Sequence, residues 1–216
     1  MSSSEKPWTI DKLVETIAST DQLAGGGAVA AMSLAGAAAT AELVFQLSAG
    51  RKKLEVHERS ELESAVQLCQ GLRQMFLQAI DEDIAALTEL MDSQNQLRKA
   101  RKSAEDVPAS IVERSREAVD AAIENPLRVA RDGKRLLRTI DELQHLARPF
   151  TASDLGAVAA TSAGAITSLL LMAEVNLAMI DQEEEATRIA QEIEDLYSQS
   201  QEQANNVVAR TRSVIR

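Results

Sequence analysis

Two stretches of this sequence carry almost no charge, and a chain that contains them has few ways to fold. Residues 28–49 contain one charged side chain, Glu42, and residues 155–180 contain only Glu174. Small side chains recur every four residues in the second stretch, which allows close contact between helices. Its length would cross a bilayer, but it lacks basic flanks and an acidic run follows it directly. We therefore expect two helices buried in a helical protein or oligomer, and no membrane partner.

Composition points to a helical protein of one domain. Alanine, leucine, glutamate and glutamine dominate, and aromatic side chains make up 2% of 216 residues, which favours helices over strands. The net charge of -10 opposes binding to nucleic acid. A polar N-terminus and a single cysteine, Cys69, indicate a cytoplasmic protein without an internal disulfide. His57 and His145 have no other ligand in metal-binding spacing, so no metal is expected.

Hydrophobic periodicity and cap residues predict six helical segments. The segments are 10–19, 25–49, roughly 54–102 after the residues Arg51-Lys52-Lys53, 110–146, 155–180 and 181–216. Thr9 and Gly50 are expected to cap the first two, Thr151 and Asp154 to form a capping box before the fifth, and Pro126 to kink or break the fourth. The last segment is expected to bury Ile189, Ile193, Leu196 and Tyr197. The predicted fold class is all-α, a single-domain bundle (residues 1–216) of long antiparallel helices with two buried helices rich in small residues.

A glycine triplet, Gly25-Gly26-Gly27, opens the first uncharged helix. Backbone N–H groups at such a helix start are free and lie at the positive end of the helix dipole, so an anionic or carbonyl-bearing ligand would fit there. The triplet follows no strand and matches neither common phosphate-binding motif. On this stretch alone, a flexible connection with tight packing behind it is the favoured explanation of the glycines.

The third segment carries an acidic residue on its apolar stripe. The stripe has a period of 3.6 and comprises Leu62, Ala65, Cys69, Leu72, Phe76, Ala79, Ile80, Leu87 and Leu90. At about 100° per residue Asp83 falls within this stripe, whereas Asp81 points almost the opposite way. A buried carboxylate without a partner is unfavourable or takes up a proton. Asp83 is therefore either an acid or base in a site, or the partner of a cation on another helix.

Together these features resemble the cyclodeaminase/cyclohydrolase family. Its all-helical domain occurs at the C-terminal end of formiminotransferase-cyclodeaminase and alone in bacterial methenyltetrahydrofolate cyclohydrolases. The motifs that carry the resemblance are Gly25-Gly26-Gly27 with Val29-Ala30-Ala31, Gly50-Arg51-Lys52-Lys53, Asp81-Glu82-Asp83 with Ala86-Leu87, Pro126 with Val129-Ala130, Ser153-Asp154 with Gly156, and Val175-Asn176-Leu177. They span nearly the whole chain in the family's order.

The resemblance implies a folate one-carbon enzyme that acts on the methenyl or formimino group of a tetrahydrofolate derivative, without a metal. It implies Asp83 as acid/base, with Asp81 or Asp154 assisting. The implied substrate-binding residues are Gly25, Gly26, Gly27, Lys52, Lys53, Ser153 and Asn176. Of these, the glycines and lysines would hold folate carboxylates or the pterin carbonyl, and Asn176 would hydrogen-bond the ring.

The resemblance also implies a homodimer or larger assembly with sites near the subunit interface. Three positions depart from the family pattern. Ala24 and Ala28 stand where proline and serine usually flank the glycines, and Glu174 stands where arginine is common. These departures keep a second interpretation open, a catalytically silent relative that serves as a folate-binding or protein-interaction bundle.

Overall fold

The computed structural model describes residues 8–20, 24–103 and 106–216. Within these residues the chain forms six α-helices and no strand, as the all-α prediction requires. The helices are α1 (Ile10–Ala18), α2 (Gly26–Ala49), α3 (Val56–Ser103), α4 (Ala109–Leu143), α5 (Ala152–Glu174) and α6 (Glu183–Ile215). Three short 3-10 turns complete the connections: η1 (Gln144–Leu146), η2 (Pro149–Thr151) and η3 (Leu177–Met179).

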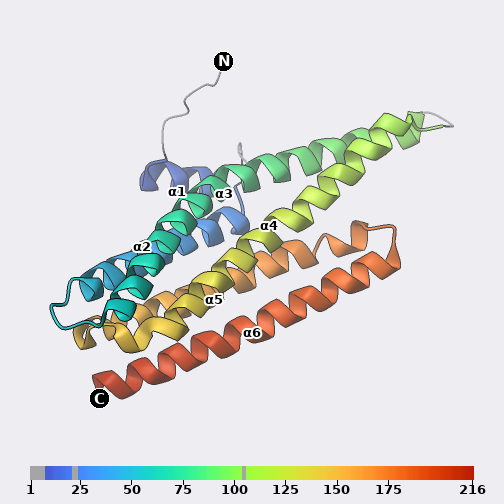
Figure 1. The fold of residues 1–216 in the computed structure, drawn as a ribbon. Coiled ribbons are helices and arrows are strands. Elements are labelled where there is room, and N and C mark those ends of the chain that lie inside the picture. Colours follow the sequence, from blue (N-terminus) through green and yellow to red (C-terminus); the bar gives the residue numbers. More distant parts are fainter. Residues whose placement is uncertain (1–7, 21–23, 104–105) are drawn as a thin grey trace.

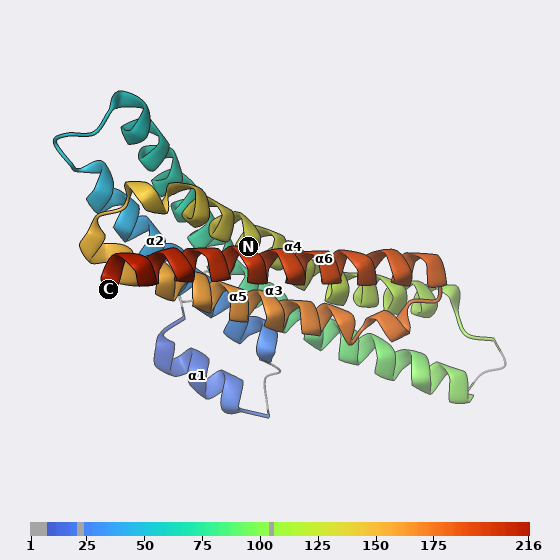
Figure 2. The same ribbon diagram turned by 90° about the horizontal axis from the view of Figure 1, so that it is seen from below.

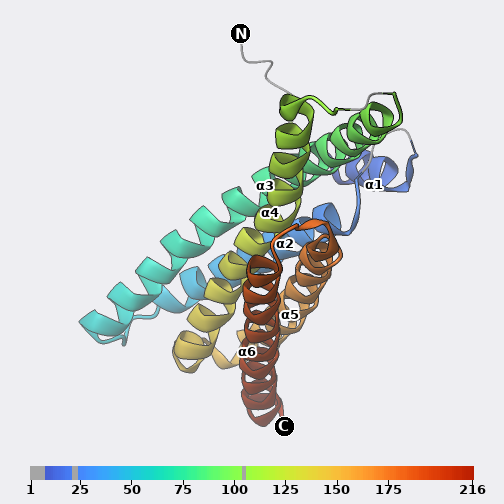
Figure 3. The ribbon, with the colours of Figure 1, turned by 90° about the vertical axis from the view of Figure 1, so that its right-hand side faces the viewer.

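The long helices form a bundle around α2, α4 and α5. Helix α2 packs against α3 and α5, and α5 packs against α4 and α6. Helices α3 and α4 form one long hairpin, and α5 and α6 form a second (Figure 1). The α2–α3 turn and the α4–α5 connection lie at the same end of the molecule as the C-terminus (Figure 1). Helix α1 lies at the edge of the bundle, away from α6 (Figures 2 and 3).

The two uncharged stretches form α2 and α5, and each buries one face. Twelve of the 24 residues of α2 and twelve of the 23 of α5 are buried. In the described part of the chain, Gly26–Ala49 and Pro149–Met179 are both long and apolar enough to cross a membrane, judged by length and composition. In the fold they are core helices. Their outer faces stay apolar: Leu43 of α2 and Leu171 of α5 are each more than half exposed.

Gly133 of α4 lies against side chains of both α2 and α5. A Cβ at this position would lie 2.9 Å from Ile166 Cγ1 of α5 and 3.2 Å from Leu34 Cδ2 of α2. Neither side chain can withdraw, because both are fully buried. The absence of a side chain at Gly133 therefore sets the spacing of the three central helices.

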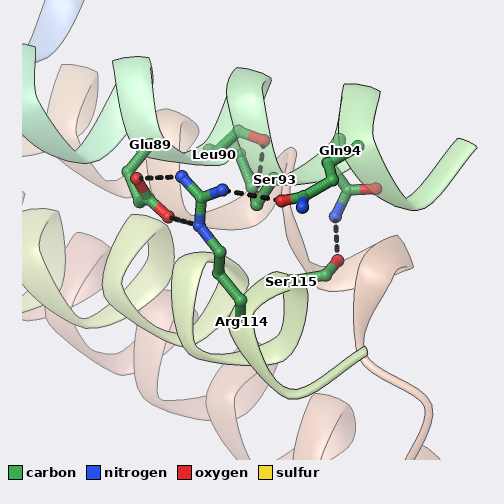
Figure 4. Close-up of polar contacts among 7 residues, drawn as sticks. Glu89, Leu90, Ser93, Gln94, Arg114 and Ser115 are labelled. Atoms are coloured by element: carbon green, nitrogen blue, oxygen red, sulfur yellow. Dashed lines mark hydrogen bonds and ion pairs between the residues drawn. The ribbon is translucent and has the colours of Figure 1, made fainter. Parts of the chain in front are cut away.

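Polar contacts join the outer halves of α3 and α4 (Figure 4). The guanidinium of Arg114 donates to both carboxylate oxygens of Glu89, at 2.6 and 2.9 Å, and also to Gln96 Oε1 at 2.7 Å. Gln94 Nε2 donates to Ser115 Oγ at 2.9 Å (Figure 4). These polar pairs lie beside buried apolar residues of the same two helices, Leu90 of α3 and Ala118 and Val119 of α4, so both kinds of contact join this part of the hairpin.

Of the local predictions at the helix ends, the caps at Thr9 and Gly50 were confirmed, whereas those at both ends of α5 were wrong. Thr9 Oγ1 accepts the Lys12 N–H at 3.2 Å, and Gly50 ends α2. The capping box before α5 is wrong, because Thr151 Oγ1 donates to Arg148 O and caps no helix. Helix α5 ends at Glu174, six residues earlier than expected.

Helix α3 begins at Val56, after a turn at Lys52 and Lys53, close to the expected start. Two further expectations differ from the structure. Helix α4 continues unbroken through Pro126. On α6 the expected inner residues Ile189, Ile193 and Leu196 are buried. Tyr197 is 42% exposed and is not one of them, since it lies one position past Leu196 on the edge of the buried stripe.

Candidate functional site

Asp83 of α3 reaches the start of α2. Its Oδ2 accepts a hydrogen bond from the Ala28 N–H at 2.9 Å. Ala28 is the third residue of α2, and its N–H is one of the groups that a helix start leaves without an internal partner. The protein's own carboxylate therefore occupies part of the anion-binding position that the glycine triplet predicted.

Gly27 is a glycine because Asp83 fills the space of a side chain. A Cβ at Gly27 would lie 2.5 Å from the carboxyl carbon of Asp83 and still closer to its Oδ1. At Gly25 and Gly26 a Cβ would meet only Leu87 at 4.0 Å and Met172 Sδ at 3.5 Å, which are ordinary contacts. Of the two explanations for the triplet, close packing therefore accounts for Gly27.

The surroundings of Asp83 favour its protonated form. Burial raises the pKa of the Asp83 carboxyl above its usual value, and the hydrogen bond from Ala28 opposes this shift only in part. No ion pair to Asp83 occurs within the described residues. The salt-bridge explanation is therefore wrong here: the nearby cation, Arg128, pairs with Glu82.

Four helices meet around Asp83. The small pocket that it lines also receives Ala31 from α2, Glu82 from α3, Asn125 and Arg128 from α4, and Leu169 from α5. Its volume is about 10 Å³, room for roughly one water molecule. A ligand as large as a folate therefore has to approach Asp83 from outside this pocket.

Sequence reasoning missed Asn125 and Arg128 as neighbours of Asp83. Arg128 belongs to a charge-rich part of α4, with Arg131, Lys134 and Arg135 close behind it, and such a run is typical of solvated surface. The available signal was Pro126, which lies between the two and also lines the pocket. An internal proline on a helix marks a place where the backbone has a special environment.

Asp81 lies on the other side of α3 from Asp83. Its Oδ1 accepts a hydrogen bond from Trp8 Nε1 at 2.7 Å, and the carboxylate is exposed. The contact ties the segment that precedes α1 to α3. The structure thus gives Asp81 a partner of its own, apart from the Asp83 pocket.

Asn176 lies close to the glycine triplet, at the end of α5. Met172, one turn before it, is the side chain nearest to Gly26. The Asn176 Nδ2 group donates to Met172 O at 2.9 Å and to Ala122 O at 3.3 Å. Both of its N–H groups are therefore engaged by backbone carbonyls, and only its Oδ1 is left to accept a hydrogen bond from a ligand.

The remaining predicted residues lie at the opposite end of the bundle. Lys52 and Lys53 follow the C-terminus of α2, and Ser153 and Asp154 begin α5; all four are exposed. The 24 residues of α2 place the glycine turn roughly 36 Å from the lysines. Within one chain, the predicted site residues therefore fall into two groups that cannot contact the same small molecule. The Asp83 group comprises Asp83, the glycine triplet and Asn176. The lysine group comprises Lys52, Lys53, Ser153 and Asp154.

The positions that depart from the family pattern have different environments. Ala24 and Ala28 are buried. Because the Asp83 bond uses the backbone N–H of Ala28, the missing serine hydroxyl does not remove it. Glu174 is exposed at the end of α5, on the side of the glycine turn.

No group of three or more His, Cys, Asp or Glu side chains that could hold a metal occurs in the part of the chain that the structure describes. The single cysteine, Cys69, is buried and is not a nucleophile at neutral pH. Burial, helped by Glu42, raises the pKa of the Cys69 thiol to about 12, so the thiolate is not formed at neutral pH.

Comparison with known proteins gives a consistent result. A family model described as formiminotransferase-cyclodeaminase matches residues 9–195. The chain is 24% identical over 192 residues to the methenyltetrahydrofolate cyclohydrolase of Methylorubrum extorquens, covering 89% of this chain and 90% of that protein. Its fold matches the crystal structure of formiminotetrahydrofolate cyclodeaminase from Thermotoga maritima with a TM-score of 0.83 and 22% identity, over 97% of this chain and 98% of that one.

Proposed function

Because this chain belongs to the formiminotransferase-cyclodeaminase family of folate one-carbon enzymes, we propose that it acts on the methenyl or formimino group of a tetrahydrofolate derivative, as a cyclohydrolase or a cyclodeaminase. The observation that supports this activity most directly is Asp83. It combines a pKa that burial raises above the ordinary aspartate value with a position against the start of α2, and both reactions need a carboxyl group that takes up and releases a proton.

In the cyclohydrolase direction, water adds to the carbon that bridges the two folate nitrogens. Asp83 takes a proton from that water and returns it to the nitrogen that leaves as the carbon–nitrogen bond breaks. The remaining hydroxyl proton goes to solvent as the formyl C=O forms, so the cationic methenyl group and water give a neutral formyl group and one proton. In the cyclodeaminase direction, a folate nitrogen attacks the formimino carbon. Asp83 takes the proton of that nitrogen and passes it to the departing ammonia. Both routes pass through a tetrahedral carbon and leave Asp83 in its starting state.

We also propose that the active protein is a homodimer or larger and that its site combines both residue groups. Helices α2 and α5 run antiparallel, with the Asp83 group at one end of their exposed faces and the lysine group at the other. Two copies that pack these faces about a two-fold axis would bring the Asp83 group of one beside the lysine group of the other. Lys52 and Lys53 would then bind the folate carboxylates, and Ser153 and Asp154 would lie within reach of the reacting end.

The charge-neutral substitution Asp83→Asn tests the acid/base role. We expect it to lower turnover of methenyltetrahydrofolate, followed by the loss of its absorbance, and ammonia release from formiminotetrahydrofolate by about 100-fold or more. Asp81→Asn is the matched control, because Asp81 is paired with Trp8 and lies outside the Asp83 pocket; we expect less than about threefold loss. Unchanged turnover in Asp83→Asn would overturn the role.

A silent relative remains the alternative, and Glu174 is the observation that favours it. Its exposed carboxylate at the end of α5 would repel an anionic folate where family members commonly carry arginine. Titration of the purified protein with tetrahydrofolate separates the two proposals. Binding without turnover would select the silent relative, and turnover would select the enzyme. For either function we propose a cytoplasmic location, where reduced folates are used.

A further inference from the structure

Pro126 leaves one carbonyl of α4 without its helical partner. In a regular helix the N–H of residue 126 would bond to the carbonyl of Ala122, but proline has no N–H. Helix α4 nevertheless continues unbroken from Ala109 to Leu143, and the Pro126 ring is buried. Water therefore has poor access to replace the missing N–H donor, and the Ala122 carbonyl needs a donor from the protein.

The missing donor comes from a different helix. Asn176 Nδ2 donates to Ala122 O at 3.3 Å, across 54 positions of sequence. The same amide donates to Met172 O at 2.9 Å. That second carbonyl also lacks its helical partner, because the backbone N–H of Asn176 bonds to Ala173 O as α5 ends. One side chain thus uses its two N–H groups for two carbonyls, one freed by proline and one freed by a helix terminus.

This bond lies next to the Asp83 pocket. Asn125, Pro126 and Arg128 form the wall that α4 contributes, and Ala122 is one turn before them. The charged groups facing Asp83 in this pocket are Glu82 of α3 and Arg128 of α4, which pair with each other; α2 and α5 contribute Gly27, Ala31 and Leu169. The position of the proline turn of α4 therefore determines how closely Asp83 is enclosed.

We propose that Asn176 is a positioning residue: it replaces the hydrogen bond that Pro126 cannot make, joins the end of α5 to the middle of α4, and so holds the pocket wall against Asp83. This role differs from the ring contact that the family resemblance implies for Asn176. The claim that Asn176 joins α5 to α4 does not depend on the activity of the protein. The effect of Asn176 on catalysis rests on the proposed function of Asp83.

A double-mutant cycle tests the hydrogen bond. Asn176→Ala leaves the Ala122 carbonyl without a donor, and we expect its thermal midpoint to fall by about 2–4 °C. Pro126→Ala restores a backbone N–H at residue 126. In that background we expect Asn176→Ala to cause less than half the loss seen with Pro126 present. Asn205→Ala, an exposed asparagine on α6, is the control and should leave the midpoint unchanged. Equal losses in the two backgrounds would overturn the proposal.

The titration of Asp83 tests positioning without any folate. The carboxyl carbon resonance of Asp83, assigned by its absence in Asp83→Asn, is followed against pH by NMR. A loosened wall admits water and weakens desolvation, so we expect the pKa of Asp83 to fall toward its ordinary value in Asn176→Ala and to recover in Pro126→Ala/Asn176→Ala. An unchanged pKa in Asn176→Ala would refute positioning. Absence of folate turnover in the wild type would refute the proposed function and leave this result intact.

Discussion

Gly27 and Asp83 depend on each other at the start of α2. The carboxylate lies where a Gly27 side chain would be, and it takes the N–H of the next residue, Ala28. Each residue was noticed in the sequence for a separate reason: the glycine for its place in a triplet, and the aspartate for its place on an apolar stripe. Their contact across 55 positions is a property of the fold and has no sequence signal.

The substitution Gly27→Ala should therefore disable the site while the bundle stays folded. The new methyl group displaces the Asp83 carboxylate, at an expected loss of about 1–3 kcal/mol in unfolding free energy and about 100-fold in turnover. Gly71→Ala on the exposed side of α3 is the control, because it lies outside the faces of α2 and α5 that the proposed dimer covers. A Cβ there meets nothing within 4 Å, so a stabilising effect of about 0.5–1 kcal/mol is expected. Chemical denaturation and the folate assays measure both variants. Wild-type turnover in Gly27→Ala would contradict the geometry.

Asp83→Asn should increase stability by an amount that depends on pH. The pKa of Asp83 is higher in the folded protein than in the unfolded chain. Its protonation therefore adds to the unfolding free energy below the ordinary aspartate pKa, and this contribution is lost as pH rises through the pKa of the folded state. At pH 7 to 8 we therefore expect Asp83→Asn to be more stable than wild type, with the difference vanishing in acid. Urea denaturation at several pH values measures it. Lower stability of the variant at pH 8 would contradict burial of the charge.

At the scale of helices, the sequence predicted most of the architecture. The period of 3.6 located the inner face of α3, because that face packs against α2 and α4 along its length. Charge content identified α2 and α5. The helix ends were less predictable: α5 stops at Glu174 where no glycine or proline stands. Its end is fixed by Asn176 bonding to α4, an interaction between helices that local sequence cannot reveal.

The C-terminus of α2 depends on an arginine from the next helix. The Arg59 guanidinium donates to Ala49 O and to Arg51 O, which places a cation at the negative end of the helix dipole. We expect Arg59→Met to lower the unfolding free energy by about 1–2 kcal/mol. Arg116→Met, which removes an exposed i,i+3 pair with Glu113, should change it by less than about 0.5 kcal/mol. Denaturant titration compares them; equal effects would show that Arg59 has no capping role.

Over the whole molecule, the exposed faces of α2 and α5 are the surface that the proposed dimer requires. Gly164 of α5 is exposed, and a Cβ there meets nothing within 4 Å. A glutamate at this position fits one chain but places charge in an apolar interface. We expect Gly164→Glu to dissociate the assembly in analytical ultracentrifugation. Ala209→Glu, at an exposed position of α6, is the control and should leave the assembly intact. A wild-type protein that sediments as a monomer would contradict the proposed assembly.

A site shared between copies predicts complementation of two inactive variants. Asp83→Asn and the double variant Lys52→Ala/Lys53→Ala each lack one residue group in every site. After refolding as a mixture, half of the dimers are mixed and one of their two sites is intact, so about a quarter of wild-type turnover should return. Activity assays before and after mixing measure it. No recovery, with mixed dimers demonstrated by mass spectrometry, would confine each site to one chain.

The hydrogen bond between Trp8 and Asp81 gives this protein an optical reporter of its own. Trp8 is the only tryptophan in the sequence, and its indole N–H is anchored two residues before Asp83 on the same helix. Emission excited at wavelengths that tryptophan absorbs and Tyr197 does not therefore originates at this one place on α3. A ligand that moves α1 or the part of α3 around Asp81 would change the wavelength and intensity of that emission. Ligand binding can then be followed without a dye or an attached label.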